Sequence, residues 1–240
     1  MPLAKLNFVH LYPDYMNHYG DAGNIVVLVK RAKWRNIEVT VENITVGDKK
    51  SFANADLIYL GGGQGREQLL ILPDLMKRKN ELFSCIANHV PILAICGGFQ
   101  LFGQYYQTSM KKTVQCLGLL DYWTIASPKR MVGKIAIRGK INGVEKTIIG
   151  FENHTGRTFL GKVQPLGKVL KGHGNNGKDN TEGVLFNNFI GTYLHGPLLP
   201  YHPLLADYIL KKALAVKHKE TRLAPLDNFL EYKAYSNIRV

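Results

Sequence analysis

Runs rich in apolar residues alternate with amphipathic segments through the first half of the chain. A short apolar run bounded by polar residues predicts a buried strand, and apolar positions three and four residues apart predict a helix. We expect strands at residues 6–11, 37–41, 56–60 and 91–95, and helices at residues 22–35, 64–79 and 81–89. This alternation predicts an α/β fold with a mostly parallel open sheet flanked by helices, in which ligands bind beyond the carboxyl ends of the strands.

The second half is less regular and predicts an antiparallel elaboration. We expect strands at residues 121–126, 131–138, 147–151, 157–160, 183–186 and 189–194, and an amphipathic helix at residues 203–219. Residues 171–180 are dense in glycine and polar side chains, which predicts a loop. The pattern weakens after residue 221. We therefore expect one domain over residues 1–220 and a C-terminal arm or tail over residues 221–240.

The most informative motif is Cys96-Gly97-Gly98-Phe99-Gln100, which directly follows the apolar run 91–95. Its two glycines let the backbone turn sharply from a strand into a helix, which we expect over residues 97–105. The N-terminal amides and dipole of that helix favour a thiolate at the sulfur. Cysteine is more often a small buried hydrophobe, and Cys85 and Cys116 fit that interpretation. Cys96 instead has the sequence context of a nucleophile elbow.

Two further motifs follow predicted strands. Gly61-Gly62-Gly63 exposes backbone amides that, with the amide of Gly97, are suited to stabilise an oxyanion. Taken alone, this turn also fits a phosphate site or a plain turn. His195, in Tyr193-Leu194-His195-Gly196-Pro197, is placed to act as general base and acid, whereas the eight histidines show no metal-ligand spacing. Together these residues predict acyl transfer at a carboxamide or ester.

Composition narrows the setting. Three cysteines without a framework spacing indicate a reducing compartment, and no apolar segment approaches the roughly 18 residues of a membrane span, so we expect a cytoplasmic chain without a transmembrane segment. The net charge of +13 fits a solvated surface, an acidic protein partner, a phosphate-bearing substrate or the anionic inner face of a membrane. Nucleic acid is disfavoured as a partner, because no nucleic-acid-binding motif accompanies the charge.

The glycine turn, the Cys96 elbow and the His195 motif resemble the class I glutamine amidotransferases of the cobyric-acid-synthase, or CobQ-like, branch. The likeness extends over most of residues 5–215 through Asp21-Ala22-Gly23-Asn24-Ile25, Gly61 to Gln68, Gly150-Phe151-Glu152-Asn153-His154 and Gly156-Arg157-Thr158.

This resemblance implies a glutaminase. Cys96 attacks the side-chain carboxamide of L-glutamine, amides near Gly62 and Gly97 hold the tetrahedral intermediate, and His195 protonates the departing ammonia and activates water. The resemblance also implies substrate-binding roles for Gln100 and for Arg130, whose guanidinium is suited to clamp the α-carboxylate of the substrate. Arg130 also has the simpler interpretation of a surface charge beside Lys129.

Within this branch, the resemblance points to the glutaminase subunits that serve lipid II amidation. It implies a heterodimer with a Mur-ligase-like subunit, MurT, which activates the D-glutamate α-carboxyl of the lipid II stem peptide with ATP and Mg²⁺. We expect no cofactor or metal in this chain, which contains no phosphate-binding lysine motif. Three alternatives stay open: a stand-alone cysteine hydrolase of γ-glutamyl compounds, an amidotransferase for a cobyric-acid-type acceptor, and a catalytically silent module.

One position departs from the class I pattern. These enzymes typically carry a glutamate two residues after the catalytic histidine, where this chain has Pro197. Proline cannot orient an imidazole, so the third member of the triad must come from elsewhere. Glu152 and Asp21 are candidates within the chain. We favour, as a hypothesis, a carboxylate supplied by the partner subunit.

Overall fold

The computed structural model describes residues 3–219 and 222–236. Its central sheet has the strand order β11-β12-β4-β3-β1-β2. These strands are β1 (Ala4–Leu11), β2 (Ile37–Ile44), β3 (Leu57–Leu60), β4 (Ile92–Ile95), β11 (Val184–Phe186) and β12 (Phe189–Thr192). Only β11 and β12 pair antiparallel within it. The predicted mostly parallel open sheet is therefore confirmed.

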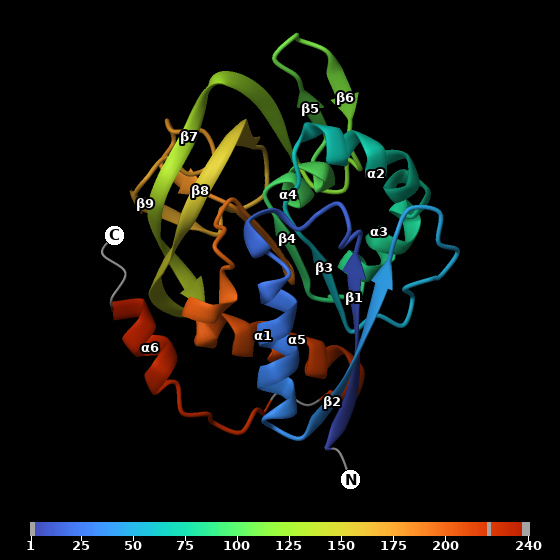
Figure 1. Ribbon diagram of the computed structural model, residues 1–240, viewed down its shortest axis with the longest axis vertical. Helices are drawn as coiled ribbons and strands as arrows, with labels where there is room; N and C mark the ends of the chain where they lie inside the picture. The colour runs from blue at the N-terminus through green and yellow to red at the C-terminus, as the bar shows by residue number, and fades with distance from the viewer. Residues whose placement is uncertain (1–2, 220–221, 237–240) are drawn as a thin grey trace.

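Helices cover both faces of this sheet (Figure 1). They are α1 (Gly23–Lys33), α2 (Gly65–Lys77), α3 (Lys79–Ala87), α4 (Gly97–Phe102) and α5 (Pro203–His218), together with the 3-10 turns η1 (His18–Gly20) and η2 (Leu199–Tyr201). α1 and α5 lie together on one face of the sheet, and α2, α3 and α4 lie on the other face, near β3 and β4. The helix predicted over residues 97–105 is shorter than expected, because the chain enters strand β5 at Tyr105.

A second sheet, with the order β10-β9-β7-β5-β6 and β8 paired to β7, forms the elaboration. Its strands are β5 (Tyr105–Gln107), β6 (Thr113–Gln115), β7 (Tyr122–Ile141), β8 (Val144–Leu160), β9 (Gly167–Lys171) and β10 (Thr181–Glu182). The strands predicted at 121–126 and 131–138 are one strand, and so are those at 147–151 and 157–160. The polar stretch around residues 127–130 is absorbed by a register shift between Ala126 and Met131.

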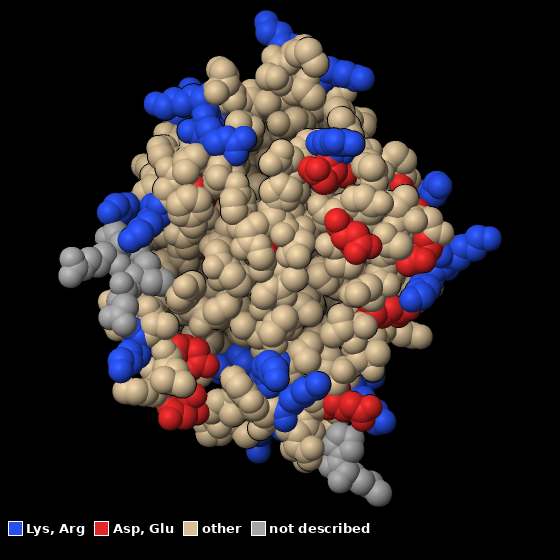
Figure 2. All heavy atoms as spheres, viewed as in Figure 1, with Lys and Arg blue, Asp and Glu red and all other residues tan. Residues whose placement is uncertain are grey.

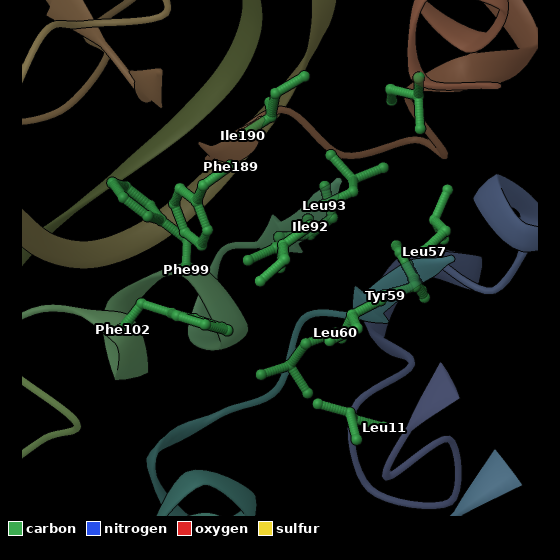
Figure 3. Close-up of a cluster of buried hydrophobic side chains, with 14 of the residues drawn as sticks. Leu11, Leu57, Tyr59, Leu60, Ile92, Leu93, Phe99, Phe102, Phe189 and Ile190 are labelled. Atoms are coloured by element: carbon green, nitrogen blue, oxygen red, sulfur yellow. The ribbon is translucent and has the colours of Figure 1, made fainter. Parts of the chain in front are cut away.

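The core fixes the carboxyl ends of the central strands. Every residue of β3, β4 and β12 is buried, as the continuous apolar runs of a two-sided parallel sheet require. Figure 3 shows Phe99 and Phe102 of α4 in the same cluster of buried side chains as Phe189 of β12, and the ring centroids of Phe102 and Phe189 lie 4.8 Å apart. This packing anchors the short helix that follows Cys96.

The segment after α5 returns along α1 and includes helix α6 (Phe229–Ser236), which the weak sequence pattern did not predict. Arg31 of α1 is 2% exposed and forms a bidentate ion pair with Asp207 of α5. The same guanidinium donates to Asn228 at 2.8 Å and to Glu231 at 3.1 Å. The domain boundary expected at residues 220 and 221 lies outside the described residues.

Charge is distributed unevenly over the fold. Residues 122–171, which form most of the second sheet, contain ten Lys or Arg and two Asp or Glu. In Figure 2, basic side chains line the edge formed by β7 and β9, whereas acidic side chains gather on the side of α2. Among the helices that the structure describes, none has the length and apolar character needed to cross a membrane.

Candidate active site

Cys96 occupies a strained turn at the carboxyl end of β4. Its φ of 47° and ψ of −106° lie in a region that residues other than glycine rarely adopt, at a cost of about 1–3 kcal/mol. The backbone N–H of Cys96 donates to the carbonyl of Thr192, the last residue of β12. This bond ties the elbow to the neighbouring strand. The backbone geometry is that of a nucleophile elbow.

The elbow and the glycine turn after β3 pack backbone to backbone. A Cβ on Gly98 would lie 2.6 Å from the carbonyl oxygen of Gly61, and one on Gly97 would collide with the carbonyl of Gly63. Both positions therefore require glycine for close approach rather than for an unusual φ. The two turns share one edge of the sheet, as the sequence pattern predicts.

His195 follows β12 and is buried at the same edge. Its backbone pairs with Phe151 of β8, and its Nδ1 lies 3.0 Å and 3.2 Å from the two carboxylate oxygens of Asp21. Its Nε2 is buried and has no hydrogen-bond partner among the described residues. Burial lowers the pKa of His195, but the Cys96 thiolate and the Asp21 carboxylate outweigh burial and raise the pKa from 6.5 to about 10. This environment favours the imidazolium form of His195.

Asp21 provides the carboxylate that the sequence analysis expected from a partner subunit. It is fully buried just before α1, and its backbone carbonyl accepts a 2.6 Å hydrogen bond from the hydroxyl of Tyr59. The partner hypothesis is therefore corrected, because Nδ1 of His195 already has a carboxylate from its own chain. Pro197, at the usual glutamate position, packs on Gly23, where a Cβ would lie 2.5 Å from the proline ring.

Glu152, the other candidate within the chain, lies in a separate network. Its carboxylate accepts hydrogen bonds from the backbone N–H of His173 at 2.7 Å and of Gly174 at 2.9 Å. Burial raises the pKa of Glu152, but the His154 ring, 3.6 Å away, the His173 ring, 2.9 Å away, and these two backbone bonds lower it more, so the net shift is downward. The carboxylate secures the loop at residues 172–180 and does not orient His195.

Gly62 lies between the three members of this group. A Cβ there would lie 2.7 Å from Asp21 Oδ2, 2.8 Å from His195 Cε1 and 3.6 Å from Cys96 Cβ. Its N–H donates to Asp21 Oδ2 at 3.0 Å. The expectation that this amide holds an oxyanion is thus corrected, because the N–H is directed at the carboxylate. The nitrogen of Gly63 lies 3.0 Å from the Cβ position of Gly97, which brings another amide next to the elbow.

A pocket of about 180 Å³ opens at Cys96 and includes Gln100 and Arg130 in its lining. Gln100, one turn after the nucleophile, is buried. Its amide oxygen accepts from the side chain of Gln68 at 2.9 Å, and its amide nitrogen donates to the hydroxyl of Tyr193 at 3.0 Å. The structure therefore brings both predicted substrate-binding residues to the pocket that contains Cys96.

A chain of hydrogen bonds runs from the exposed Arg130 through the half-buried Asn153 of this pocket to the exposed Tyr19. Arg130 donates to the side-chain oxygen of Asn153 at 2.7 Å, and the Asn153 amide donates to the hydroxyl of Tyr19 at 2.6 Å. The ring of Tyr19 packs edge-on against His195, with centroids 4.9 Å apart. The sequence analysis gave Asn153 and Tyr19 no role, although Asn153 stands inside a motif that it quoted.

The other two cysteines differ from Cys96. Burial raises the pKa of the Cys85 thiol to about 11 and that of the Cys116 thiol to about 12. Both thiols are therefore protonated and unreactive at neutral pH. Within residues 3–219 and 222–236, no cluster of three or more His, Cys, Asp or Glu is arranged to hold a metal ion.

Comparison with proteins of known structure reveals a similar fold. A protein described as a glutamine amidotransferase in its crystal structure aligns with a TM-score of 0.58 and 15% identity, over 85% of this chain and 98% of that one. At this identity the likeness establishes the fold alone.

Sequence comparisons are more specific. Residues 7–203 match the CobB/CobQ-like glutamine amidotransferase domain. The chain is 40% identical to the lipid II isoglutaminyl synthase (glutamine-hydrolyzing) subunit GatD of Staphylococcus aureus, over 97% of this chain and 94% of that one. It is 38% identical to the GatD subunit of Streptococcus pneumoniae, over 98% and 92% of the two chains. A probable cobyric acid synthase of Methanothermobacter thermautotrophicus is 32% identical over 66% of this chain and 33% of its own length. This chain belongs to the CobB/CobQ-like family of glutamine amidotransferases.

Proposed function

We propose that this chain is the glutamine-hydrolysing subunit of a lipid II isoglutaminyl synthase. Two relatives that bear that name match it over nearly the full length of both chains. The observation that carries the proposal is the buried Cys96, His195 and Asp21 arrangement at one sheet edge, beside a pocket of about 180 Å³. A cysteine, a general base and an orienting carboxylate constitute the machinery of acyl transfer through a thioester.

In the proposed reaction, Nε2 of His195 takes the proton of the Cys96 thiol, while Asp21 holds the ring through Nδ1 and stabilises its positive charge. The sulfur attacks the side-chain carbonyl carbon of L-glutamine. The amide of Gly97, the first residue of α4, has no acceptor within the helix and is suited to receive the oxyanion with that of Gly63.

Collapse of the tetrahedral intermediate breaks the carbon–nitrogen bond. The imidazolium of His195 gives its proton to the leaving nitrogen, so that ammonia departs and a γ-glutamyl thioester remains on Cys96. The neutral imidazole then takes a proton from water as the water attacks the thioester. Glutamate leaves, the thiol is reprotonated, and the sum is glutamine plus water to glutamate plus ammonia.

Substrate recognition is assigned to Arg130 and Gln100, which line the pocket at Cys96. The guanidinium of Arg130 is proposed to pair with the α-carboxylate of glutamine, and Asn153 holds it by accepting one of its five donors. Gln100 is proposed to contact the substrate through the remaining capacity of its amide, because Gln68 and Tyr193 fix the orientation of that amide.

The ammonia is proposed to pass to a Mur-ligase-like subunit, MurT. That partner would hold ATP and Mg²⁺ and amidate the D-glutamate α-carboxyl of the lipid II stem peptide. We place the heterodimer in the cytoplasm, with the basic second sheet favouring the anionic inner face of the membrane, where each basic side chain near the surface contributes about 1 kcal/mol. Binding to vesicles that is indifferent to anionic lipid would remove the membrane part of the proposal.

Ammonia release from L-glutamine tests the proposal. The wild type, Cys96→Ala and the control Cys116→Ala are each assayed alone and with the Mur-ligase-like partner. We expect release by the wild type and the control and none by Cys96→Ala. Release from γ-glutamyl peptides but not from glutamine would favour the stand-alone hydrolase instead. Amidation of a cobyric-acid-type acceptor, with none of lipid II, would move the acceptor to that class.

A further inference from the structure

Glu182 is a fully buried carboxylic acid near the catalytic histidine. It ends β10 of the second sheet, and the chain passes from it through Gly183 into β11 of the central sheet. Its carboxyl oxygens accept hydrogen bonds from the backbone N–H of Tyr193 at 2.7 Å and from the hydroxyl of Thr192 at 3.1 and 3.0 Å. Burial of a carboxyl group is costly, and these bonds offset part of that cost.

The two residues that Glu182 holds form the joint between nucleophile and base. Thr192 is the last residue of β12, and its carbonyl accepts the N–H of Cys96 at 2.8 Å. Tyr193 lies just beyond the end of β12, and its N–H donates to the carboxyl group of Glu182 and not to a neighbouring strand. The Thr192 hydroxyl also accepts the N–H of Leu194 at 3.1 Å, which bends the chain toward His195.

We propose that Glu182 is a positioning residue for the catalytic pair, because its carboxyl group fixes the Thr192–Tyr193 joint that sets His195 relative to Cys96. The inference rests on the proposed catalytic site. Glu182 touches neither the reacting atoms nor the pocket lining described above, so it acts through these two neighbours. The substrate contact assigned to Arg130 does not involve this joint, whereas Gln100 is linked to it through the hydroxyl of Tyr193 and is also held by Gln68.

The charge of this group adds a measurable signature. Burial is the largest effect on the pKa of Glu182 and raises it, and the nearby carboxylate of Glu152 raises it further. The bonds from Tyr193 and Thr192 and the charge of His195 lower it, which leaves a pKa of about 8. Glu182 is therefore mostly protonated at pH 7 and becomes charged above pH 8. Its negative charge then stabilises the imidazolium of His195, because the coupling between the two groups is reciprocal.

Two substitutions separate positioning from charge. Glu182→Gln keeps an acceptor for the N–H of Tyr193 and removes the titration, whereas Glu182→Leu removes both. We expect Glu182→Leu to lower kcat at least tenfold with KM changed less than threefold, and to slow alkylation of Cys96 by iodoacetamide. Glu182→Gln should keep kcat within about threefold of the wild type at pH 7, and the alkaline limb of its pH–rate profile should move to lower pH. Glu145→Gln, an exposed acid of the same sheet, is the control.

The alkylation rate requires no glutamine, so the two proposals fail separately. A wild type that releases no ammonia, while Glu182→Leu still slows alkylation of Cys96, removes the glutaminase proposal and keeps this one. A folded Glu182→Leu with wild-type kcat and alkylation overturns the positioning role, and so does a Glu182→Gln that loses as much activity as the leucine variant. If Glu182→Leu does not fold, Thr192→Val removes the bonds of this hydroxyl to Glu182 and to Leu194 and keeps the bond between Glu182 and the N–H of Tyr193. This variant must lower kcat, since an unchanged kcat contradicts the inference.

Discussion

Replacing Asp21 by asparagine should nearly abolish glutaminase activity, and the structure dictates how. The N–H of Gly62 donates to Asp21 Oδ2 at 3.0 Å, so the oxygen of an asparagine amide must occupy that position. Its NH₂ group then takes the place of Oδ1, which lies 3.2 Å from Nδ1 of His195. The NH₂ group competes there with the amide oxygen, which lies 3.0 Å from Nδ1, and by donating to Nδ1 it favours the tautomer with the ring proton on Nε2. In that tautomer the histidine cannot accept the thiol proton of Cys96.

We expect kcat for Asp21→Asn to fall about 10³- to 10⁴-fold, the loss that a wrong tautomer produces in other triads. This corresponds to about 4 to 5.5 kcal/mol in the barrier. KM should change little, because Asp21 is not assigned a contact with the substrate. Loss of the carboxylate charge also lowers the pKa of His195, now about 10, so the alkaline limb of the residual rate moves to lower pH.

The assay is ammonia release across pH 6 to 10, with thermal unfolding recorded for each variant. Asp14→Asn is the matched control, because this exposed carboxylate belongs to the same loop between β1 and α1 and is expected to leave kcat unchanged. A folded Asp21→Asn that keeps kcat within threefold of the wild type would refute the reasoning. Recovery of that variant on addition of the partner subunit would restore the idea of a carboxylate supplied in trans.

Three further predictions concern packing, substrate binding and stability. Gly62→Ala should lower kcat about 10²-fold, since its methyl would lie 2.7 Å from the triad carboxylate and 2.8 Å from the imidazole; unaltered kcat in ammonia release would contradict this. Asn153→Ala should raise KM for glutamine about tenfold with little change in kcat, because the guanidinium of Arg130 loses the side chain that holds it. An unchanged KM would show that Asn153 does not position Arg130 for substrate binding. Asp207→Ala should lower the free energy of unfolding by about 3 kcal/mol in urea titrations, because it removes the carboxylate that pairs with the buried guanidinium groups of Arg31 and Arg35; a loss below about 1 kcal/mol would show that the remaining contacts of Arg31 with the C-terminal segment compensate.

The first half of the fold could be predicted because local pattern and final environment agree. The strands that became β3 and β4 are buried on both faces, so their continuous apolar runs carry the signal directly. The second sheet was harder for a physical reason. β10 has two residues and β5 and β6 have three each, too short for any period, and the polar residues 127–130 within β7 mimic a strand end.

The candidate site likewise contains residues that local sequence could predict and residues that only the folded chain brings together. Cys96 and His195 could be selected because each follows a buried strand at a glycine-containing turn, which is local information. Asp21 could be named as a candidate for the third triad member but could not be preferred over the alternatives, because it lies 174 residues from the histidine that it orients. The direction of the Gly62 amide was equally out of reach, since nothing in a run of three glycines says which N–H meets the carboxylate and which faces the elbow.

Covalent trapping tests the central claim most directly. 6-Diazo-5-oxo-L-norleucine, a reactive analogue of glutamine, is incubated with the chain alone and with its partner, and the labelled residue is located by peptide mass spectrometry. The account predicts a single adduct on Cys96, slowed by excess L-glutamine and by Asp21→Asn. An adduct on Cys85 or Cys116, or labelling of Cys96 that glutamine does not slow, would contradict it.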